Sequence, residues 1–326
     1  MAVDASDGRV LVERLRVIEN NLLPLVPVAA VAGLALPGVG VALSGLVTPL
    51  LALMMLAVAL TFDLDTLRRV LKRPGVQALA TGLVYGPMSL AGWLLGRLAF
   101  GTGPFGLGFA LVGTLPTDVS SPLLVYIARG NVALATVLNA INTALAPILV
   151  PALFLLYTGV DLDVPVVALM AELALTVIVP TVVGVAVRTR WPLRIEPAEP
   201  VLSATASLAY LLLVIAVVGP NAEAILAQPA MITAAAGVAL ALNAFGYLLG
   251  WSITPLLPDP ADRTAMLFTT SKKEFSIAAF VVFASGLPPE IALPSVVFAV
   301  VQMITSPLVA RTIARRASTA GPDEQP

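Results

Sequence analysis

Two short segments place charged and hydroxyl side chains inside stretches that are otherwise apolar. GTLPTDVSSPLL carries Asp118, and FTTSKKEFSIA carries Lys272, Lys273 and Glu274, so that two of the three lysines of the chain are adjacent. A charged side chain at the centre of a bilayer costs roughly 2.5–3.5 kcal/mol on insertion scales. Such side chains are retained where they pair, line a wet cavity or take part in function. These two segments are therefore the candidate site.

Both segments are expected to interrupt a helix at membrane depth. Pro116 and Pro122 each remove a backbone donor. The second segment contains neither Pro nor Gly, so its break must come from its hydroxyl residues and the charged triplet. Freed carbonyls at that depth need water, protein or an ion, and the N-terminal ends of half-helices attract anions. The candidate substrate- and ion-binding residues are Thr117, Asp118, Ser120, Ser121, Asn139, Thr269, Thr270, Ser271, Lys273 and Glu274, with Lys272, Glu172, Asn142 and Gln302 as secondary candidates.

Structural roles are the alternative for the same side chains. Asp118 could simply neutralise one of the two lysines and hold two helices together. Adjacent residues point about 100° apart on a helix, so one lysine could extend its ammonium group to an interface. Asn139 and Asn142 share a helix face, where amides serve equally as contacts between helices or as site lining.

Composition indicates an all-α membrane protein. The 326 residues are 59% hydrophobic and 11% charged, against about 25% charged residues in soluble domains. Without Cys or His, the chain has no disulfides, thiol chemistry, Cys/His zinc sites or histidine proton relays. No metal site or cofactor is predicted, and the near-neutral net charge gives no sign of nucleic-acid binding. No paired nucleophile and base suggests an enzyme, and the charged N-terminus predicts no cleaved signal peptide.

Apolar windows predict ten transmembrane helices. Their ranges are 22–36, 41–63, 76–99, 106–128, 132–158, 164–187, 201–219, 229–251, 263–285 and 291–313. With this count, 15 of the 18 basic residues fall on the side of both termini, which predicts an inner-membrane protein with both termini in the cytoplasm. We expect a cytoplasmic segment (1–20), a single transporter domain (21–316) and a disordered tail (317–326).

The two halves of the chain are similar to each other. The fifth span has Asn142 followed five residues later by Pro147, and the tenth has Gln302 followed by Pro307. The interrupted spans are the fourth and the ninth, which is the same position in each half of five. Because five is odd, two such halves must have opposite topology. We therefore predict inverted repeats over about 21–160 and 161–316, with the site where their broken helices cross.

The stretch PTDVSSPLLVYIARGNVALATVLNAINTALAPILVPALF resembles the bile acid:sodium symporter family, including its bacterial members. That family has the pattern P-G-G-x-x-S-N-x-x-x-Y-x-A-x-G-N-x-A-L-S, followed by a helix ending T-S-P-L-x-x-P. The matching residues are Pro116, Ser121, Tyr126, Ala128, Gly130, Asn131, Ala133, Leu134, Pro147 and Pro151. The resemblance extends from about residue 20 to 315. It implies an NhaA-like fold with a panel domain, a core domain and two crossing broken helices.

The positions at which family members bind sodium are largely replaced. Ser121 is kept, but the resemblance aligns the remaining sodium ligands of the family with Pro122, Ala135, Asn139, Gly82, Thr269, Lys273 and Glu274. Because a Gln of the family aligns with Lys273, we expect Lys273 to be the lysine that faces the site. Our hypothesis is that its ammonium group replaces sodium and pairs with Asp118, and that a proton or an anionic substrate breaks this pair.

The sequence therefore predicts a secondary active transporter of a small, anionic organic solute, working by alternating access in the lipid bilayer. The coupling ion is a proton or sodium. One alternative is sodium symport with Glu274 and backbone carbonyls as ligands, and another is an uncoupled channel or a non-transporting membrane protein. Arsenite-type carriers share the fold but rely on a cysteine in the fourth span, which this chain lacks. No motif predicts an oligomeric state.

Overall fold

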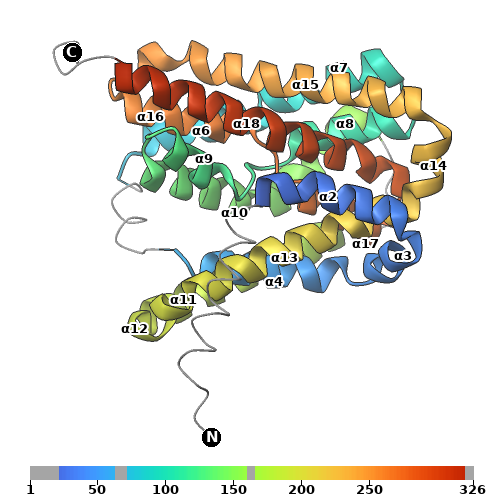
Figure 1. The fold of residues 1–326 in the computed structure, drawn as a ribbon, viewed down its shortest axis with the longest axis horizontal. Helices are drawn as coiled ribbons and strands as arrows, with labels where there is room; N and C mark the ends of the chain where they lie inside the picture. The colour runs from blue at the N-terminus through green and yellow to red at the C-terminus, as the bar shows by residue number, and fades with distance from the viewer. Residues whose placement is uncertain (1–21, 63–71, 160–165, 320–326) are drawn as a thin grey trace, which may run out of the picture.

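The computed structural model describes residues 22–62, 72–159 and 166–319, and within these ranges the chain is helical without strands (Figure 1). The α-helices are α2 (Leu22–Ala35), α3 (Pro37–Ser44), α4 (Val47–Ala59), α6 (Pro74–Tyr85), α7 (Pro87–Phe100), α8 (Pro104–Thr114), α9 (Ser121–Ile127), α10 (Val132–Thr158), α11 (Val166–Arg190), α12 (Pro192–Ile195), α13 (Glu199–Val218), α14 (Ala222–Ala227), α15 (Pro229–Ser252), α16 (Pro260–Ser271), α17 (Phe275–Ala284) and α18 (Leu293–Thr319).

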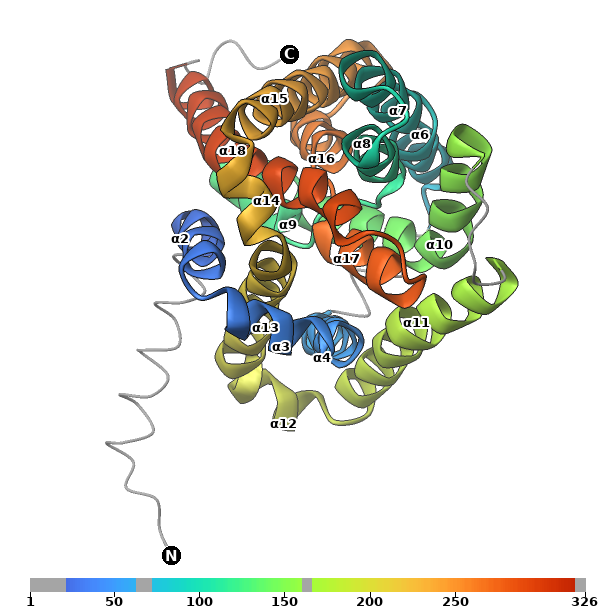
Figure 2. The same cartoon turned by 90° about the vertical axis from the view of Figure 1, so that its right-hand side faces the viewer.

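The helices form two layers, which Figures 1 and 2 show from two directions. In the first layer α4 packs against α11 and α13, and α13 packs against α2 and α3. In the second layer α7 packs against α8, and α15 packs against α7, α16 and α18. Contacts of α10 with α11, of α17 with α4 and of α18 with α2 join the layers. The candidate site lies in the second layer, on the side where Tyr210 of α13 contacts it.

Several helical stretches have the length and composition of membrane spans. Among the described residues, six are long and apolar enough to cross a bilayer, or seven if the bent pair α2 and α3 is one span. The chain bends by 102° at that pair, because Pro37 starts a new helix. The second predicted span was expected to begin at residue 41, which lies inside α3, and α4 begins only at Val47. The count of ten spans stays a prediction.

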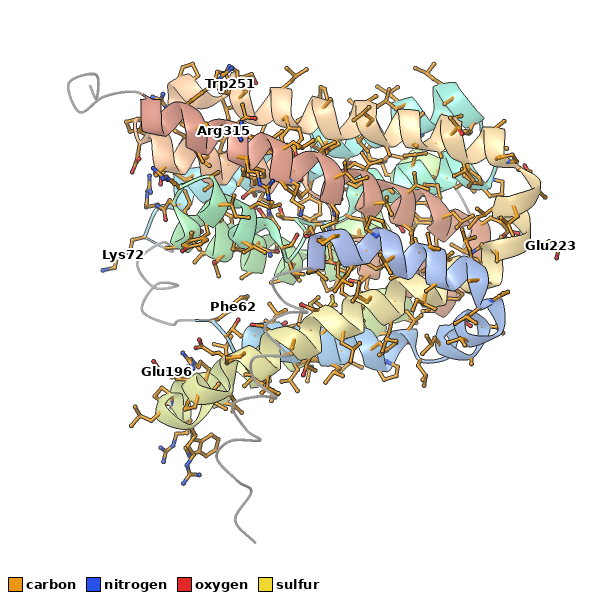
Figure 3. All side chains as sticks on the ribbon, in the orientation of Figure 1. Phe62, Lys72, Glu196, Glu223, Trp251 and Arg315 are labelled. Carbon is orange, nitrogen blue, oxygen red and sulfur yellow. The ribbon has the colours of Figure 1, made fainter. Side chains whose placement is uncertain are left out.

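Charged side chains gather at the ends of the long helices. In Figure 3, Lys72, Glu196 and Arg315 lie at one end of the molecule and Glu223 lies at the other. At the first end the Asp262 carboxylate, on α16, accepts hydrogen bonds from Arg73 (2.6 Å) and Asn131 (2.8 Å). The hydrogen bond that Arg73 donates to the Asp262 carboxylate raises the pKa of its guanidinium above the ordinary value. This contact ties the starts of α6, α10 and α16 together.

The chain leaves helical geometry at the two segments where breaks were expected. Residues 115–120 separate α8 from α9, and Pro122 lies in the first turn of α9, where its missing N–H costs nothing. Residues 272–274 separate α16 from α17 and are extended, with φ −108° and ψ 142° at Lys272. Thr269, Thr270 and Ser271, which were expected to be part of this break, belong instead to the last turn of α16.

The boundary predicted for the C-terminal tail was wrong. Residues 317–319 continue α18, which ends at Thr319, because neither Gly nor Pro occurs between Pro307 and Gly321. The rest of that tail and the predicted N-terminal segment 1–20 lie outside the described residues.

Candidate functional site

The two unwound segments bind each other directly. The Glu274 N–H donates to the Pro116 carbonyl (3.0 Å), and the Val119 N–H donates to Glu274 Oε2 (3.0 Å). The Thr117 hydroxyl donates to the Thr269 carbonyl (2.8 Å). We call the place where residues 115–120 and 272–274 meet the crossing. There the backbone groups that have no helical partner form hydrogen bonds with the other segment, as buried polar groups must.

Helix α10 donates side-chain hydrogen bonds to the first unwound segment, residues 115–120. The side-chain amide of Asn142 donates to the Thr117 hydroxyl (3.1 Å), and that of Asn139 donates to the Asp118 carbonyl (3.3 Å). Both asparagines are buried. They contact backbone and hydroxyl groups of the segment, so they position residues 117–118.

Asp118 is fully buried and surrounded by donors from three other elements. Its Oδ1 accepts hydrogen bonds from the Ser120 N–H (2.9 Å) and the Ser120 hydroxyl and lies 3.2 Å from the Lys272 ammonium. Its Oδ2 accepts from the Tyr210 hydroxyl (3.0 Å) and the Gln302 amide (3.1 Å). This donor set matches a carboxylate, which only accepts.

The structure corrects the expected pairing of the lysines. Lys272, not Lys273, forms the ion pair with Asp118, and it also donates to the Ser120 hydroxyl. Neither lysine is peripheral, because both side chains are buried. The reason is the extended geometry of residues 272–274: successive side chains alternate along an extended chain instead of following a helical turn.

Lys273 occupies a cradle of backbone carbonyls. Its Nζ donates to the carbonyls of Val84 (2.9 Å), Gly113 (2.8 Å) and Leu115 (2.8 Å). These carbonyls belong to the last turn of α6 and to the end of α8, where helix termini leave acceptors without intrahelical partners. All three ammonium protons are thus satisfied. A ring of carbonyl oxygens is also what a bound cation requires, and here a side chain supplies the cation.

Gln302 and Glu274 complete the network. The Gln302 Oε1 accepts from the Lys273 N–H (3.0 Å), and its Nε2 donates to the Lys273 carbonyl (3.0 Å) as well as to Asp118. Glu274 caps α17 by accepting from the Ser276 N–H (3.3 Å) and hydroxyl (2.6 Å). Asp118, Lys272, Lys273 and Glu274 together carry two formal positive and two formal negative charges, so the crossing is neutral without an added ion.

Other candidates lie at different places. Glu172 is exposed on α11 and does not belong to the crossing. Thr270 donates to the Gly246 carbonyl (3.1 Å), and the Ser271 carbonyl accepts from Asn243 (2.8 Å), so these residues fix α16 to α15. The buried Ser121 hydroxyl has no hydrogen-bond partner among the described residues.

Tyr210 is the site residue that the sequence reasoning missed. It lies on α13, in the opposite layer, and is fully buried against Phe275 with ring centroids 4.6 Å apart. A tyrosine inside an apolar span is also compatible with packing alone. The only sequence signal was its hydroxyl, which needs a partner at that depth.

Two hollows lie between the layers next to the crossing. One of about 160 Å³ is lined by Leu22, Val58, Thr61, Val119, Ser120, Leu123, Ser203, Ala206, Ser207 and Tyr210. A second of about 20 Å³ is lined by Met55, Val58, Ala59, Phe62, Val119, Asn139, Ala140, Thr143 and Thr181. Val58 and Val119 line both hollows. The larger one thus brings hydroxyl groups next to Ser120 and Tyr210, two of the residues that bind Asp118.

Comparison with known proteins identifies the kind of molecule. The family model described as "Sodium Bile acid symporter family" matches residues 48–228. The chain is 27% identical over 287 residues to "Uncharacterized sodium-dependent transporter YocS" of Bacillus subtilis (strain 168), covering 87% of each chain. It is 28% identical over 207 residues to "Probable sodium/metabolite cotransporter BASS1, chloroplastic" of Arabidopsis thaliana (64% of this chain, 51% of the relative). It is 26% identical over 260 residues to "Ileal sodium/bile acid cotransporter" of Homo sapiens (77% and 72%). These relatives are transporters and not enzymes.

Proposed function

Since the chain belongs to the sodium bile acid symporter family, and is thus an integral membrane transporter, we propose that it is a secondary active carrier of a small organic anion that does not use sodium at the usual positions. The observation that carries this proposal is the neutral crossing, in which the Lys273 ammonium fills a cradle of three carbonyls. An ammonium group there supplies the charge that a bound cation would supply and repels sodium.

The solute site in this proposal is the larger hollow between the layers. Ser120 lines it and also binds both Asp118 and Lys272. An anion in the hollow competes with Asp118 for Lys272 and for the Ser120 hydroxyl. Its volume of about 160 Å³ is below the 300–1,000 Å³ of drug-sized sites, which favours a solute smaller than a bile acid.

Charge balance suggests how the solute is coupled to a proton. When an anion takes over Lys272, a proton on Asp118 keeps the net charge of the buried site at zero. The empty and the loaded carrier then bury the same net charge. Both can change between the inward-open and the outward-open state without an uncompensated charge in a medium of low dielectric constant. The expected coupling is one proton with each anion, through Asp118.

In this proposal the chain has ten spans in two inverted five-helix repeats. The first layer is the panel domain and the second layer is the core domain. Both termini lie in the cytoplasm, at the inner membrane. The breaks at 115–120 and 272–274 support it, because they lie in the fourth and ninth of the predicted spans. So does the basic end of α18.

Sodium symport is the second candidate, because the relatives are described as sodium-dependent or sodium-coupled and the Ser121 hydroxyl is buried without a partner. In that case Glu274 would be a sodium ligand. Both of its carboxylate oxygens, however, accept hydrogen bonds from Val119 and Ser276, so the residue would have to release these donors to bind an ion.

Transport in proteoliposomes tests the proposal. The purified protein is reconstituted and offered a panel of small carboxylates and sulfonates under a sodium gradient, a proton gradient or neither. We expect uptake that follows the proton gradient and is unaffected when choline replaces sodium. Asp118→Asn should abolish the response to pH, whereas the exposed carboxylate variant Glu172→Gln should keep it. Uptake that requires sodium, or an Asp118→Asn variant with unchanged pH dependence, would overturn the proposal.

A further inference from the structure

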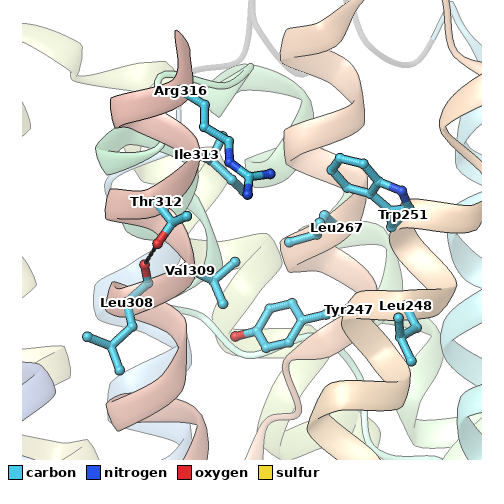
Figure 4. A pocket seen from close by; sticks show the side chains of 9 residues that line it. All are labelled: Tyr247, Leu248, Trp251, Leu267, Leu308, Val309, Thr312, Ile313 and Arg316. Atoms are coloured by element: carbon cyan, nitrogen blue, oxygen red, sulfur yellow. Dashed lines mark hydrogen bonds between the residues drawn. The ribbon is translucent and has the colours of Figure 1, made fainter. Parts of the chain in front are cut away.

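A third hollow, on the outside of the molecule, has the character of a lipid site. It measures about 360 Å³, lies between α15, α16 and α18, and is shown in Figure 4. Its lining residues are Tyr247, Leu248, Trp251, Leu267, Leu308, Val309, Thr312, Ile313 and Arg316. It shares no residue with the crossing or with the hollows between the layers, and the proposed function does not use it.

The side chains along the sides of this groove are exposed, whereas the side chain at its base is buried. Leu248 is 68% exposed and Leu308 60%, whereas Leu267 on α16 is 6% exposed and forms the floor. Two of these helices, α15 and α18, lie within apolar stretches long enough to span a bilayer. In a membrane protein such an outward groove faces lipid, and its apolar walls match the chemistry of an acyl chain.

Charge and aromatic character are concentrated at one end. Arg316 and Trp251 lie toward one end of the groove, and Tyr247 and Leu248 toward the other (Figure 4). Arg311 and Arg315 on the same end of α18 are exposed as well, and none of the nine lining residues is acidic. Tryptophan is enriched at the level of lipid headgroups, and basic pockets between transmembrane helices bind anionic headgroups.

We propose that this groove binds one anionic phospholipid, with an acyl chain along Leu248, Leu267 and Leu308 and the phosphate at Arg316. The bound chain fills the space between α15 and α18 and packs on α16. Helix α16 leads directly into Lys272 and is already tight against α15, because a Cβ added at Gly250 would lie 2.7 Å from the Leu267 Cα. Occupancy of the groove is therefore expected to stabilise the core layer around the crossing.

Thermal unfolding of the purified full-length protein in detergent, with added lipid, tests this site. We expect palmitoyl-oleoyl-phosphatidylglycerol to raise the melting temperature by roughly 5 °C at a hundredfold excess over its dissociation constant. The matched zwitterionic phosphatidylcholine should give less than half that shift, and soluble glycerol phosphate none. Native mass spectrometry should retain one phosphatidylglycerol per protein.

Three variants separate binding in the groove from binding by diffuse surface charge. Arg316→Gln should remove the preference for phosphatidylglycerol, whereas Arg311→Gln, on the same helix end but outside the groove, should keep it. Val309→Trp, which fills the groove, should abolish the response to both lipids. Equal stabilisation of the wild-type protein by the two lipids, or the same loss in Arg316→Gln and Arg311→Gln, would overturn the proposal. The comparison of the two arginine variants remains decisive if Val309→Trp does not fold.

Discussion

Asp118, Lys272, Lys273 and Glu274 are buried ionisable residues whose partners come from several helices. Burial of a charge is tolerated only when geometry and hydrogen bonds compensate for lost hydration, and removing one partner of a buried pair typically costs about 3–5 kcal/mol. The carboxylate of Asp118 has donors from three other residues besides the Lys272 ammonium. The pair is therefore best examined by removing each charge alone and then both together.

We predict that Lys272→Met lowers the free energy of unfolding by about 3–5 kcal/mol, because it leaves the Asp118 carboxylate buried without its cation. Asp118→Asn should be similarly damaging, since it leaves a buried ammonium. The double variant should recover much of the loss, as expected for coupled neighbours. Thermal unfolding in detergent, followed by tryptophan fluorescence, measures all three. Strictly additive losses would contradict the pairing seen in the structure.

The position of this site could be predicted from sequence, but not its connections. Pro116 and Pro122, combined with charge at membrane depth, mark the first break, and the charged triplet marks the second. Proline alone is not sufficient, because α10 continues through Pro147 and Pro151. The roles of Lys272 and Lys273 could not be assigned, since an extended stretch without Pro or Gly leaves no local signal of its geometry. The partner on α13, Tyr210, depends on how the two layers meet, which no local pattern encodes.

At the scale of elements, close packing of α7 on α8 positions one of the carbonyls that hold Lys273. A Cβ added at Gly92 would lie 2.5 Å from the Gly113 Cα and 2.8 Å from the Phe109 carbonyl oxygen. Both are backbone atoms, so they cannot rotate out of the way. Any side chain at Gly92 therefore has to push the end of α8 away from α7, and with it the Gly113 carbonyl.

Gly92→Ala is accordingly expected to destabilise the protein by about 1–3 kcal/mol, in the range for overpacked interiors. Its matched control is Gly237→Ala on α15, where an added Cβ meets nothing within 4 Å. That change should be neutral or stabilising by up to ~1 kcal/mol, because alanine favours a helix interior. Melting temperatures of the two variants provide the comparison, and equal effects would show that the α7–α8 contact is not tight.

The elements themselves were only partly predictable. The division at Pro37 was predicted, because the spans 22–36 and 41–63 lie on either side of it. The short Gly45–Leu46 connection between α3 and α4 was not predicted, since hydropathy windows do not detect it. Glu172 was a candidate because a carboxylate in an apolar run suggests function, yet its side chain points out of the bundle. Hydropathy reports that a helix is apolar but not which face it buries.

For the whole molecule, the proposed carrier requires the two layers to move relative to each other. Val58 on α4 and Val119 on the unwound segment line both hollows between the layers, so they lie on the two sides of the interface that the proposal requires to move. The chain has no cysteine, which makes it a clean background for cross-linking.

We predict that the variant Val58→Cys/Val119→Cys loses transport when treated with a short bifunctional thiol reagent whose linker can be cleaved by reduction. Activity should return after cleavage, because the link ties one layer to the other. Each single-cysteine variant, treated in the same way, should stay active. Full uptake in the cross-linked double variant would mean that the layers do not move against each other at these residues.

The central claim is that internal ammonium groups replace sodium at the crossing, and thermal stability in sodium chloride against choline chloride tests it most directly. We expect the wild-type protein to melt at the same temperature in both salts. Lys273→Met, which frees the carbonyls of Val84, Gly113 and Leu115, should melt lower in choline and recover in part with sodium, as a ligand bound to the folded state requires. Saturable stabilisation of the wild-type protein by sodium would contradict the account, because it would show that an ion site remains beside the lysines.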